Sequence, residues 1–138
     1  MDDHSKNLIK DYKFWTLNIH PNQCYLGRTY IWAKRDDAVD LMDATSEELL
    51  ELQLIGKELK SALDSLWKPD MVNYAALGNV TRHLHMHVIP RYRESRELES
   101  ITFSDDRFGK NHVPYNREFK IPESTLLKIR DNIKKKLI

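Results

Sequence analysis

One stretch of this chain, residues 73–92, constrains the fold more than any other. Within it His83, His85 and His87 alternate with apolar residues. Strict alternation over this length is the period of a half-buried β-strand, so the three imidazoles are expected on one face and the apolar side chains in a core. Pro90 lacks a backbone donor, and it should therefore end regular pairing or restrict this end of the strand to a sheet edge.

A metal site is the first chemistry to consider for such a face. Histidine is the commonest transition-metal ligand, and two histidines at i and i+2 can reach one ion. On a regular strand, however, His83 and His87 are roughly 13 Å apart, whereas a zinc–nitrogen bond is only about 2 Å long. A mononuclear site would need a strong bend or ligands from elsewhere, and Cys24 is the single cysteine. A metal-dependent enzyme that uses two of the histidines stays open as an alternative.

Nucleophilic attack on phosphorus by the central His85 is the second chemistry. One imidazole nitrogen is nucleophilic when the other carries the proton and is held by an acceptor. His83 is placed to help hold that geometry, and His87 is placed to donate to a phosphate oxygen or a leaving group. A purely structural role for all three is the weaker interpretation, because three histidines in register are hard to supply by chance.

The segment HLHMHVI resembles the His-x-His-x-His-x-x signature of the histidine-triad (HIT) superfamily, in which x is apolar, and Pro90-Arg91 extends the match. This resemblance implies nucleotide hydrolysis or transfer through a nucleotidyl-histidine intermediate. His85 would be the nucleophile, His83 its orienting partner, in part through its main chain, and His87 a contact to the phosphates. The implied fold is α+β and HIT-like, with about five antiparallel strands, one long helix packed on the sheet, a C-terminal helix and, commonly, a homodimer.

A weaker resemblance covers residues 27–35, where the family has a Gly-His pair before an apolar strand. Here Arg28 replaces the histidine. Arginine does not donate a proton near neutral pH, but its planar guanidinium suits a phosphate. Val80 stands where many members have Ser or Thr three residues before the triad, so the backbone N–H of the turn would have to replace that hydroxyl. The predicted nucleotide- and phosphate-binding residues are Asn18, Arg28, Asn73, Asn79 and Val80.

Length and composition set bounds on the remaining possibilities. A chain of 138 residues forms one domain, 1–138, that buries roughly two-thirds of its unfolded surface. Lys plus Arg number 22 and Asp plus Glu 21, for a net charge of +1, which favours neither nucleic acid nor a membrane as partner. A single cysteine excludes an intrachain disulfide. The polar start and the lack of a long apolar run predict a cytoplasmic protein.

The coarse pattern also predicts the other elements. A capping box of Thr45 and Glu48 opens a long amphipathic helix, and a second helix follows Pro122. Strands are expected over residues 14–18, over 24–35 with an interruption at Gly27, and over 71–77 in a hairpin with the histidine strand. Residues 91–107 are expected to form a loop. His112 is a further candidate for the site, although isolated histidines are more often surface groups.

These observations together predict a nucleotide hydrolase or nucleotidyl transferase. It would act on the α-phosphate of dinucleoside polyphosphates or nucleoside phosphoramidates. No cofactor is expected to be required, although a divalent cation could accompany a polyphosphate substrate. The expected partners are the small-molecule nucleotide and a second copy of the chain. Arg28 and Val80 support an alternative, a nucleotide-binding regulatory protein whose hydrolysis is vestigial.

Overall fold

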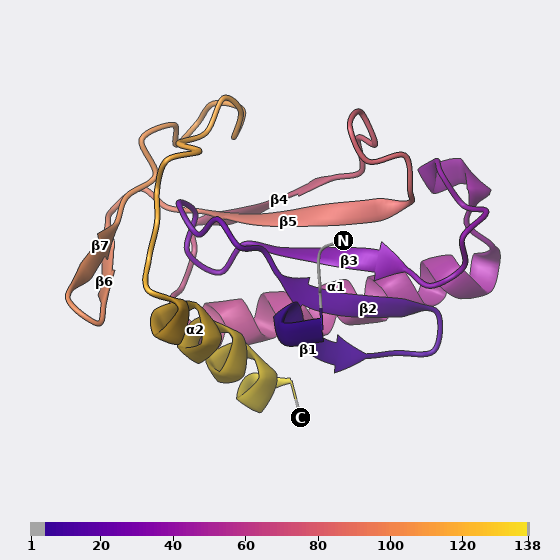
Figure 1. Ribbon diagram of the computed structural model, residues 1–138, viewed down its shortest axis with the longest axis horizontal. Coiled ribbons are helices and arrows are strands. Elements are labelled where there is room, and N and C mark those ends of the chain that lie inside the picture. Colours follow the sequence, from indigo (N-terminus) through magenta and orange to yellow (C-terminus); the bar gives the residue numbers. More distant parts are fainter. Residues whose placement is uncertain (1–4, 138) are drawn as a thin grey trace.

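A computed structural model describes residues 5–137 of the chain. Within these residues a five-stranded antiparallel sheet lies against two α-helices, as the sequence predicts (Figure 1). In sheet order the strands are β1 (Leu8–Asp11), β2 (Trp15–Ile19), β3 (Thr29–Ala33), β5 (His85–Arg91) and β4 (Met71–Ala75). The sequence analysis predicts no strand at β1, whose four residues are two apolar and two charged ones.

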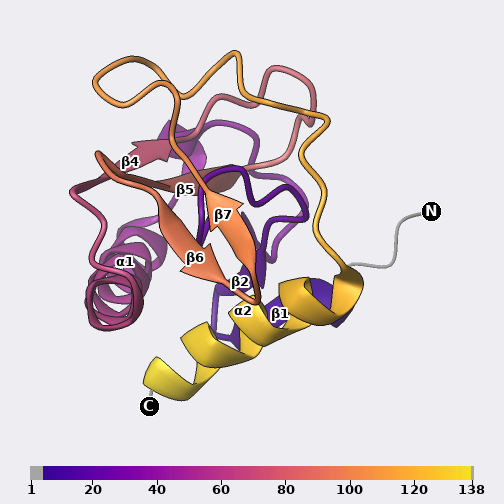
Figure 2. The ribbon, with the colours of Figure 1, turned by 90° about the vertical axis from the view of Figure 1, so that its left-hand side faces the viewer.

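Both helices cover the same face of the sheet. The predicted capping box opens α1 (Ser46–Leu66), where the Thr45 hydroxyl accepts from the Glu48 N–H and the Glu48 carboxylate accepts from the Thr45 N–H. The C-terminal helix α2 (Glu123–Lys136) follows Pro122. Figure 2 shows both helices on one side of the sheet and the connection that leads from β7 to α2 on the other. No helix of the described chain is long and apolar enough to cross a membrane.

The helix-covered face carries the main core. Trp15, Leu17 and Ile19 of β2 are fully buried there, and Ile31 of β3 lies beside them. Helix residues with no exposure to solvent close the core from the other side; they are Ile55, Leu59, Leu63, Ile129 and Ile133. Because side chains alternate along a strand, the residues between these core positions face the opposite side of the sheet.

The prediction of a strand over residues 24–35 was wrong in its first half. Residues 24–28 form a loop, and β3 begins at Thr29. Gly27 has a φ of +88°, and a Cβ at this position would lie only 2.8 Å from Cδ2 of Leu63. The glycine therefore serves a turn packed tightly against α1, and it is not a bulge within a strand.

Two other predictions concern the end of the histidine strand: the loop over residues 91–107 was wrong, and for Pro90 the edge position was confirmed. Residues 91–107 are not simply a loop, because they contain the two-stranded sheet of β6 (Arg96–Leu98) and β7 (Ile101–Phe103). Pro90 does not end strand pairing, since it pairs with Val72 of β4. The pairing of β5 with β3 stops at Val88, so this end of β5 has only β4 as a neighbour, which is the edge position that proline tolerates.

Candidate active site

The face of the sheet away from the helices gathers the histidines and a set of polar and aromatic side chains. Directly opposed residues on neighbouring antiparallel strands point to the same side. The opposed pairs on this face are Thr16 with Trp32, Asn18 with Tyr30, Trp32 with His85, and Tyr30 with His87. The consecutive strands β2 and β3 and the distant strand β5 therefore bring their side chains to one surface, which we call the histidine face.

The alternation predicted that His83 lies within the histidine strand. It lies instead at a bend just before β5. Its ring stacks on the Trp32 indole with 4.0 Å between centroids, and its Nε2 lies 2.6 Å from the carbonyl oxygen of Ala33. A carbonyl oxygen only accepts, so this nitrogen is the donor. The ring of His83 is thereby fixed against β3.

His85 is 9% exposed, and its Nδ1 lies 2.6 Å from the carbonyl oxygen of His83. This hydrogen bond assigns the proton to Nδ1 and leaves the lone pair of Nε2 free. The main chain of His83 thus orients His85, which is the arrangement that the family resemblance implies. A neutral imidazole held in this tautomer is suited to nucleophilic attack.

His87 lies beside His85, with 4.9 Å between the ring centroids. Its Nδ1 is buried and has no hydrogen-bond partner among the described residues. Burial, followed by the charge of Arg28, lowers the pKa of His87 to about 4. His87 is therefore neutral at pH 7 in the unliganded protein, with a nitrogen available to a ligand.

His20 belongs to the site, and it is not among the site residues predicted from the sequence. The His20 ring is 5.8 Å from that of His87, and its Nδ1 accepts a hydrogen bond of 3.0 Å from the N–H of Asn22. Burial, and then the charge of Arg28, lowers its pKa to about 3. The sequence offered one signal for His20, its position directly after a strand and before Pro21. Only the register of β2 against β3 places its ring beside that of His87.

Arg28 is buried on the same side of the molecule, with 3% of its surface exposed. Its guanidinium carbon lies 4.4 Å from the centroid of the Tyr115 ring, while Nε and Nη1 lack a hydrogen-bond partner within residues 5–137. His112 is also buried, contrary to the expectation of a surface group. Burial and the charge of Arg28 lower the pKa of His112. Both residues join the triad in one site.

The remaining predicted binding residues are placed differently. Asn18 is buried and donates to Thr16, and a recess of about 120 Å³ on the histidine face is lined by Thr16, Asn18, Tyr30 and Trp32. The amide oxygen of Asn73 accepts from Nη1 of Arg91 at 2.9 Å. Asn79 and Val80 lie in the loop between β4 and β5, where both are exposed and Val80 is 94% accessible. The structure does not bring these last two side chains to the imidazoles.

The site has no evident cage for a metal ion. Across residues 5–137, no group of three or more His, Cys, Asp or Glu side chains is arranged to hold one. The side chains gathered here are imidazoles, a guanidinium and hydroxyl or amide groups. They can bind an anion and attack an electrophile.

A model of the HIT domain matches residues 14–94 of the chain. A HIT-like protein of Mycoplasma genitalium is 31% identical over 75 residues, which are 51% of this chain and 52% of that protein. The chain thus spans about half the length of this curated relative.

Solved structures share the fold. A histidine triad protein from Bradyrhizobium japonicum has a TM-score of 0.76 at 19% identity, with 95% of this chain and 90% of that chain covered. The diadenosine triphosphate hydrolase of Plasmodium falciparum, in complex with cyclomarin A, has a TM-score of 0.64 at 13% identity, with coverage of 95% and 76%. These similarities show a common fold, and the domain match covers more than half of the chain. With its triad at 83, 85 and 87, this protein belongs to the HIT domain family.

Proposed function

We propose that this protein is a nucleotide hydrolase or nucleotidyl transferase that cleaves a phosphoanhydride or phosphoramidate bond through a covalent adduct on His85. The observation that carries this proposal is the 2.6 Å hydrogen bond between Nδ1 of His85 and the carbonyl oxygen of His83. It aims the lone pair of Nε2 away from the strand, toward the open histidine face. A fixed tautomer is what a histidine nucleophile requires.

The proposed reaction has two displacements. The Nε2 lone pair of His85 forms a bond to the α-phosphorus, and the bond to the leaving group breaks with its electron pair staying on the leaving oxygen or nitrogen. Water or another acceptor then attacks the same phosphorus, the phosphorus–nitrogen bond breaks, and its electron pair returns to Nε2. With water, the products are a nucleoside monophosphate and a proton, and His85 is regenerated. Dividing one hard step into two is the contribution of a covalent nucleophile.

The neighbouring groups have consistent roles in this proposal. The recess lined by Asn18, Tyr30 and Trp32 is a place for part of the nucleoside beside His85. In this proposal His87, whose Nδ1 has no partner among the described residues, contacts a phosphate of the substrate. Contacts of Asn73, Asn79 and Val80 to phosphate stay predictions, and for Val80 only the backbone N–H can make one. The name of the Plasmodium falciparum relative, a diadenosine triphosphate hydrolase, supports dinucleoside polyphosphates as one substrate class.

The test compares the wild type with His85→Ala on diadenosine triphosphate and on an adenosine phosphoramidate, with and without chelator. We expect the variant to lose turnover by about 10³-fold or more while it keeps its fold, measured by circular dichroism, and its nucleotide affinity. Acid-quenched wild type should carry one adenylyl group on the peptide that contains His85.

Each contrary outcome selects another function. Ordinary turnover by His85→Ala would contradict the role of this residue. Nucleotide binding without turnover or adduct would favour the regulatory alternative. Loss of turnover on chelation, together with a stoichiometric metal, would favour the metal-dependent alternative.

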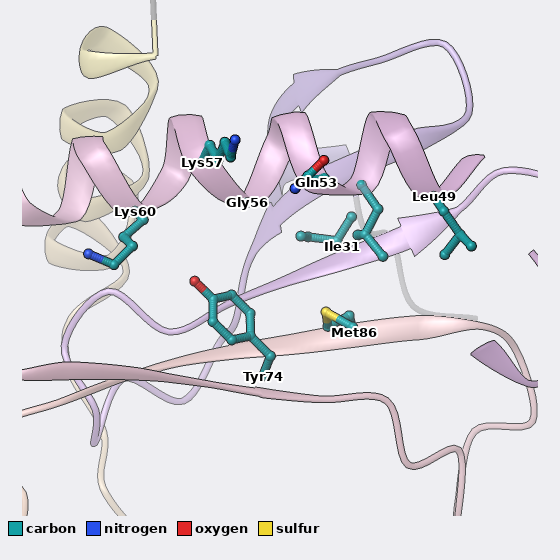
Figure 3. A pocket seen from close by; sticks show the side chains of 9 residues that line it. Ile31, Leu49, Gln53, Gly56, Lys57, Lys60, Tyr74 and Met86 are labelled. Atoms are coloured by element: carbon teal, nitrogen blue, oxygen red, sulfur yellow. The ribbon is translucent and has the colours of Figure 1, made fainter. Parts of the chain in front are cut away.

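The proposed protein partner is a second copy of the chain, bound at the outer side of β4. This strand ends the sheet order, so its outer backbone groups have no ladder partner among the described strands, and such an edge readily pairs with another chain. Beside it lies a groove of about 320 Å³ between α1 and the sheet. Figure 3 shows Tyr74, Met86, Ile31 and Leu49 around this groove.

A cytoplasmic location stays a prediction from the sequence.

A further inference from the structure

Arg28 poses a problem of electrostatics in the unliganded protein. The side chain is 97% buried, because only 3% of its surface is exposed, and the nitrogen atoms Nε and Nη1 reach neither solvent nor a hydrogen-bond acceptor in the described chain. A buried charge without paired acceptors is costly, and proteins normally satisfy it with a carboxylate, a carbonyl or a bound ion. The two guanidinium nitrogen atoms without acceptors therefore indicate a binding site, in which a ligand supplies the hydrogen-bond acceptors.

The surroundings of Arg28 contain no compensating carboxylate. Within residues 5–137 no Asp or Glu side chain forms an ion pair with it, although Arg91, also buried, pairs with Asp105 at 2.7 Å. The neighbours of Arg28 are instead Tyr115, which it contacts through the ring and through a side-chain hydrogen bond, and the imidazoles of His87 and His112. A third buried nitrogen without a partner, Nδ1 of His87, belongs to the same group. The cluster is built to receive negative charge.

The position of Arg28 separates it from the atom that His85 attacks. Arg28 directly precedes Thr29, the first residue of β3, so it faces the histidine side one step beyond the pair of Tyr30 and His87. Its Cα is therefore two such steps, roughly 13 Å along the strands, from the level of His85. The attacked phosphorus must lie about 3–3.5 Å from Nε2 of His85. In the strand register, the level of His87 lies between those of Arg28 and His85.

We infer that Arg28, with His87, His112 and Tyr115, forms a second phosphate subsite that binds the leaving phosphate, so that the substrates are phosphoanhydrides rather than phosphoramidates. This inference rests on the proposed function, because it names the leaving group of that same reaction. A cavity of about 390 Å³ next to His112 and to Ala75, which pairs with His87, gives room for a group attached beyond the leaving phosphate.

The chemistry of the two leaving groups supports this choice. When the phosphorus–oxygen bond of an anhydride breaks, the electron pair stays on a phosphate oxygen, and a guanidinium stabilises that charge without transferring a proton. When a phosphoramidate is cleaved, the nitrogen must gain a proton from an acid. His87, whose pKa is lowered to about 4, is neutral at pH 7 in the free protein and is a poor source of that proton.

The experiment measures kcat/KM for diadenosine triphosphate and for an adenosine 5′-alkylphosphoramidate, which share the adenylyl group and differ in the leaving group. For Arg28→Gln we expect a loss of about tenfold or more on the triphosphate, because hydrogen bonds to a charged group disappear, and less than a threefold change on the phosphoramidate. Arg28→Lys should recover part of the loss. The matched control is Arg117→Gln, since Arg117 also stacks on Tyr115, at 4.9 Å, but is exposed.

A binding measurement keeps the inference testable if turnover is absent or a variant folds poorly. By calorimetry, wild type should bind ADP at least about tenfold more tightly than AMP, because only ADP supplies the second phosphate. Arg28→Gln, or Arg28→Lys if the former does not fold, should reduce this ratio. Equal losses on both substrates, or an ADP to AMP ratio independent of Arg28, would overturn the inference while the histidine mechanism stands. If no variant and no wild type turned over substrate while the ratio of ADP to AMP affinity still depended on Arg28, only the mechanism through His85 would be overturned.

Discussion

The two faces of the central sheet differ in what they bury. The face under α1 and α2 buries Trp15, Leu17 and Ile31, which are apolar and closed by helix side chains. The histidine face buries Asn18, His85 and other polar groups, and some of its nitrogen atoms have no partner in the described chain. Burial of apolar surface stabilises the fold, whereas burial of unpaired polar groups costs free energy. One sheet thus separates the source of stability from the source of chemistry.

The alternation of a β-strand makes this separation possible. Leu17 and Asn18 are neighbours in β2 and are both buried, yet they lie on opposite faces. Val88 and His87 are neighbours in β5 and also lie on opposite faces, with Val88 buried and His87 half-buried. Adjacent residues of a strand contact different side chains. A substitution on the core face can therefore change the packing without changing the contacts of the side chains on the histidine face.

The largest effect on stability is expected from the pair Leu17→Ala and Asn18→Ala. Leu17→Ala should lower the free energy of unfolding by about 3 kcal/mol, since it removes core volume, and should leave nucleotide affinity unchanged in the folded fraction. Asn18→Ala removes hydrogen bonds to Thr16 and should cost about 1 kcal/mol, with weaker nucleotide binding. Urea unfolding and calorimetric titration measure both quantities. Comparable losses of stability in the two variants would contradict the division between the faces.

A second prediction concerns the place where the helix-covered face is not closed. Tyr74 is 47% exposed and belongs to β4, the edge strand at which we place a second copy of the chain; it also borders the groove between α1 and the sheet. Tyr74→Glu should raise the dissociation constant of the dimer by about 10–100-fold, because it places a charge in an apolar contact. Sedimentation velocity over a concentration series measures this. The control is Thr102→Glu in β7, which is exposed on the smaller sheet; a wild type that stays monomeric throughout would exclude the dimer.

The smallest effect is the pH dependence of stability that the histidine face creates. The folded pKa values of His20 and His87 are lowered to about 3 and about 4, while the unfolded values are near 6.5. Between pH 7 and 6 the unfolded chain therefore binds more protons than the folded one, so stability falls as the pH falls. We expect a loss of about 1 kcal/mol over this range. Replacing both histidines by Asn should flatten the slope of unfolding free energy against pH, and an unchanged slope would refute this origin.

Local signals in the sequence were sufficient for several elements. Thr45 and Glu48 form the capping box that they predict, because the motif uses only groups within one turn. The alternation at 83–88 places His85 and His87 on one face for the same reason. The loop at 24–28 was missed because the positive φ of Gly27 and its contact with Leu63 depend on packing against α1. The β6–β7 pair was missed because each strand is only three residues long and β6 lies in a charge-rich segment.

The sequence by itself determined the triad, the alternation that separates the faces, the caps of the long helix and the HIT family. These features are encoded by residues close together in the chain, so their geometry follows from backbone periodicity. Only the tertiary structure decided that His20, Arg28 and His112 surround His87, and that Asn73 contacts Arg91 while Asn79 and Val80 lie in an exposed loop. Those positions depend on strand register and on a loop that crosses the sheet more than twenty residues after the triad, and no local pattern in the chain encodes either.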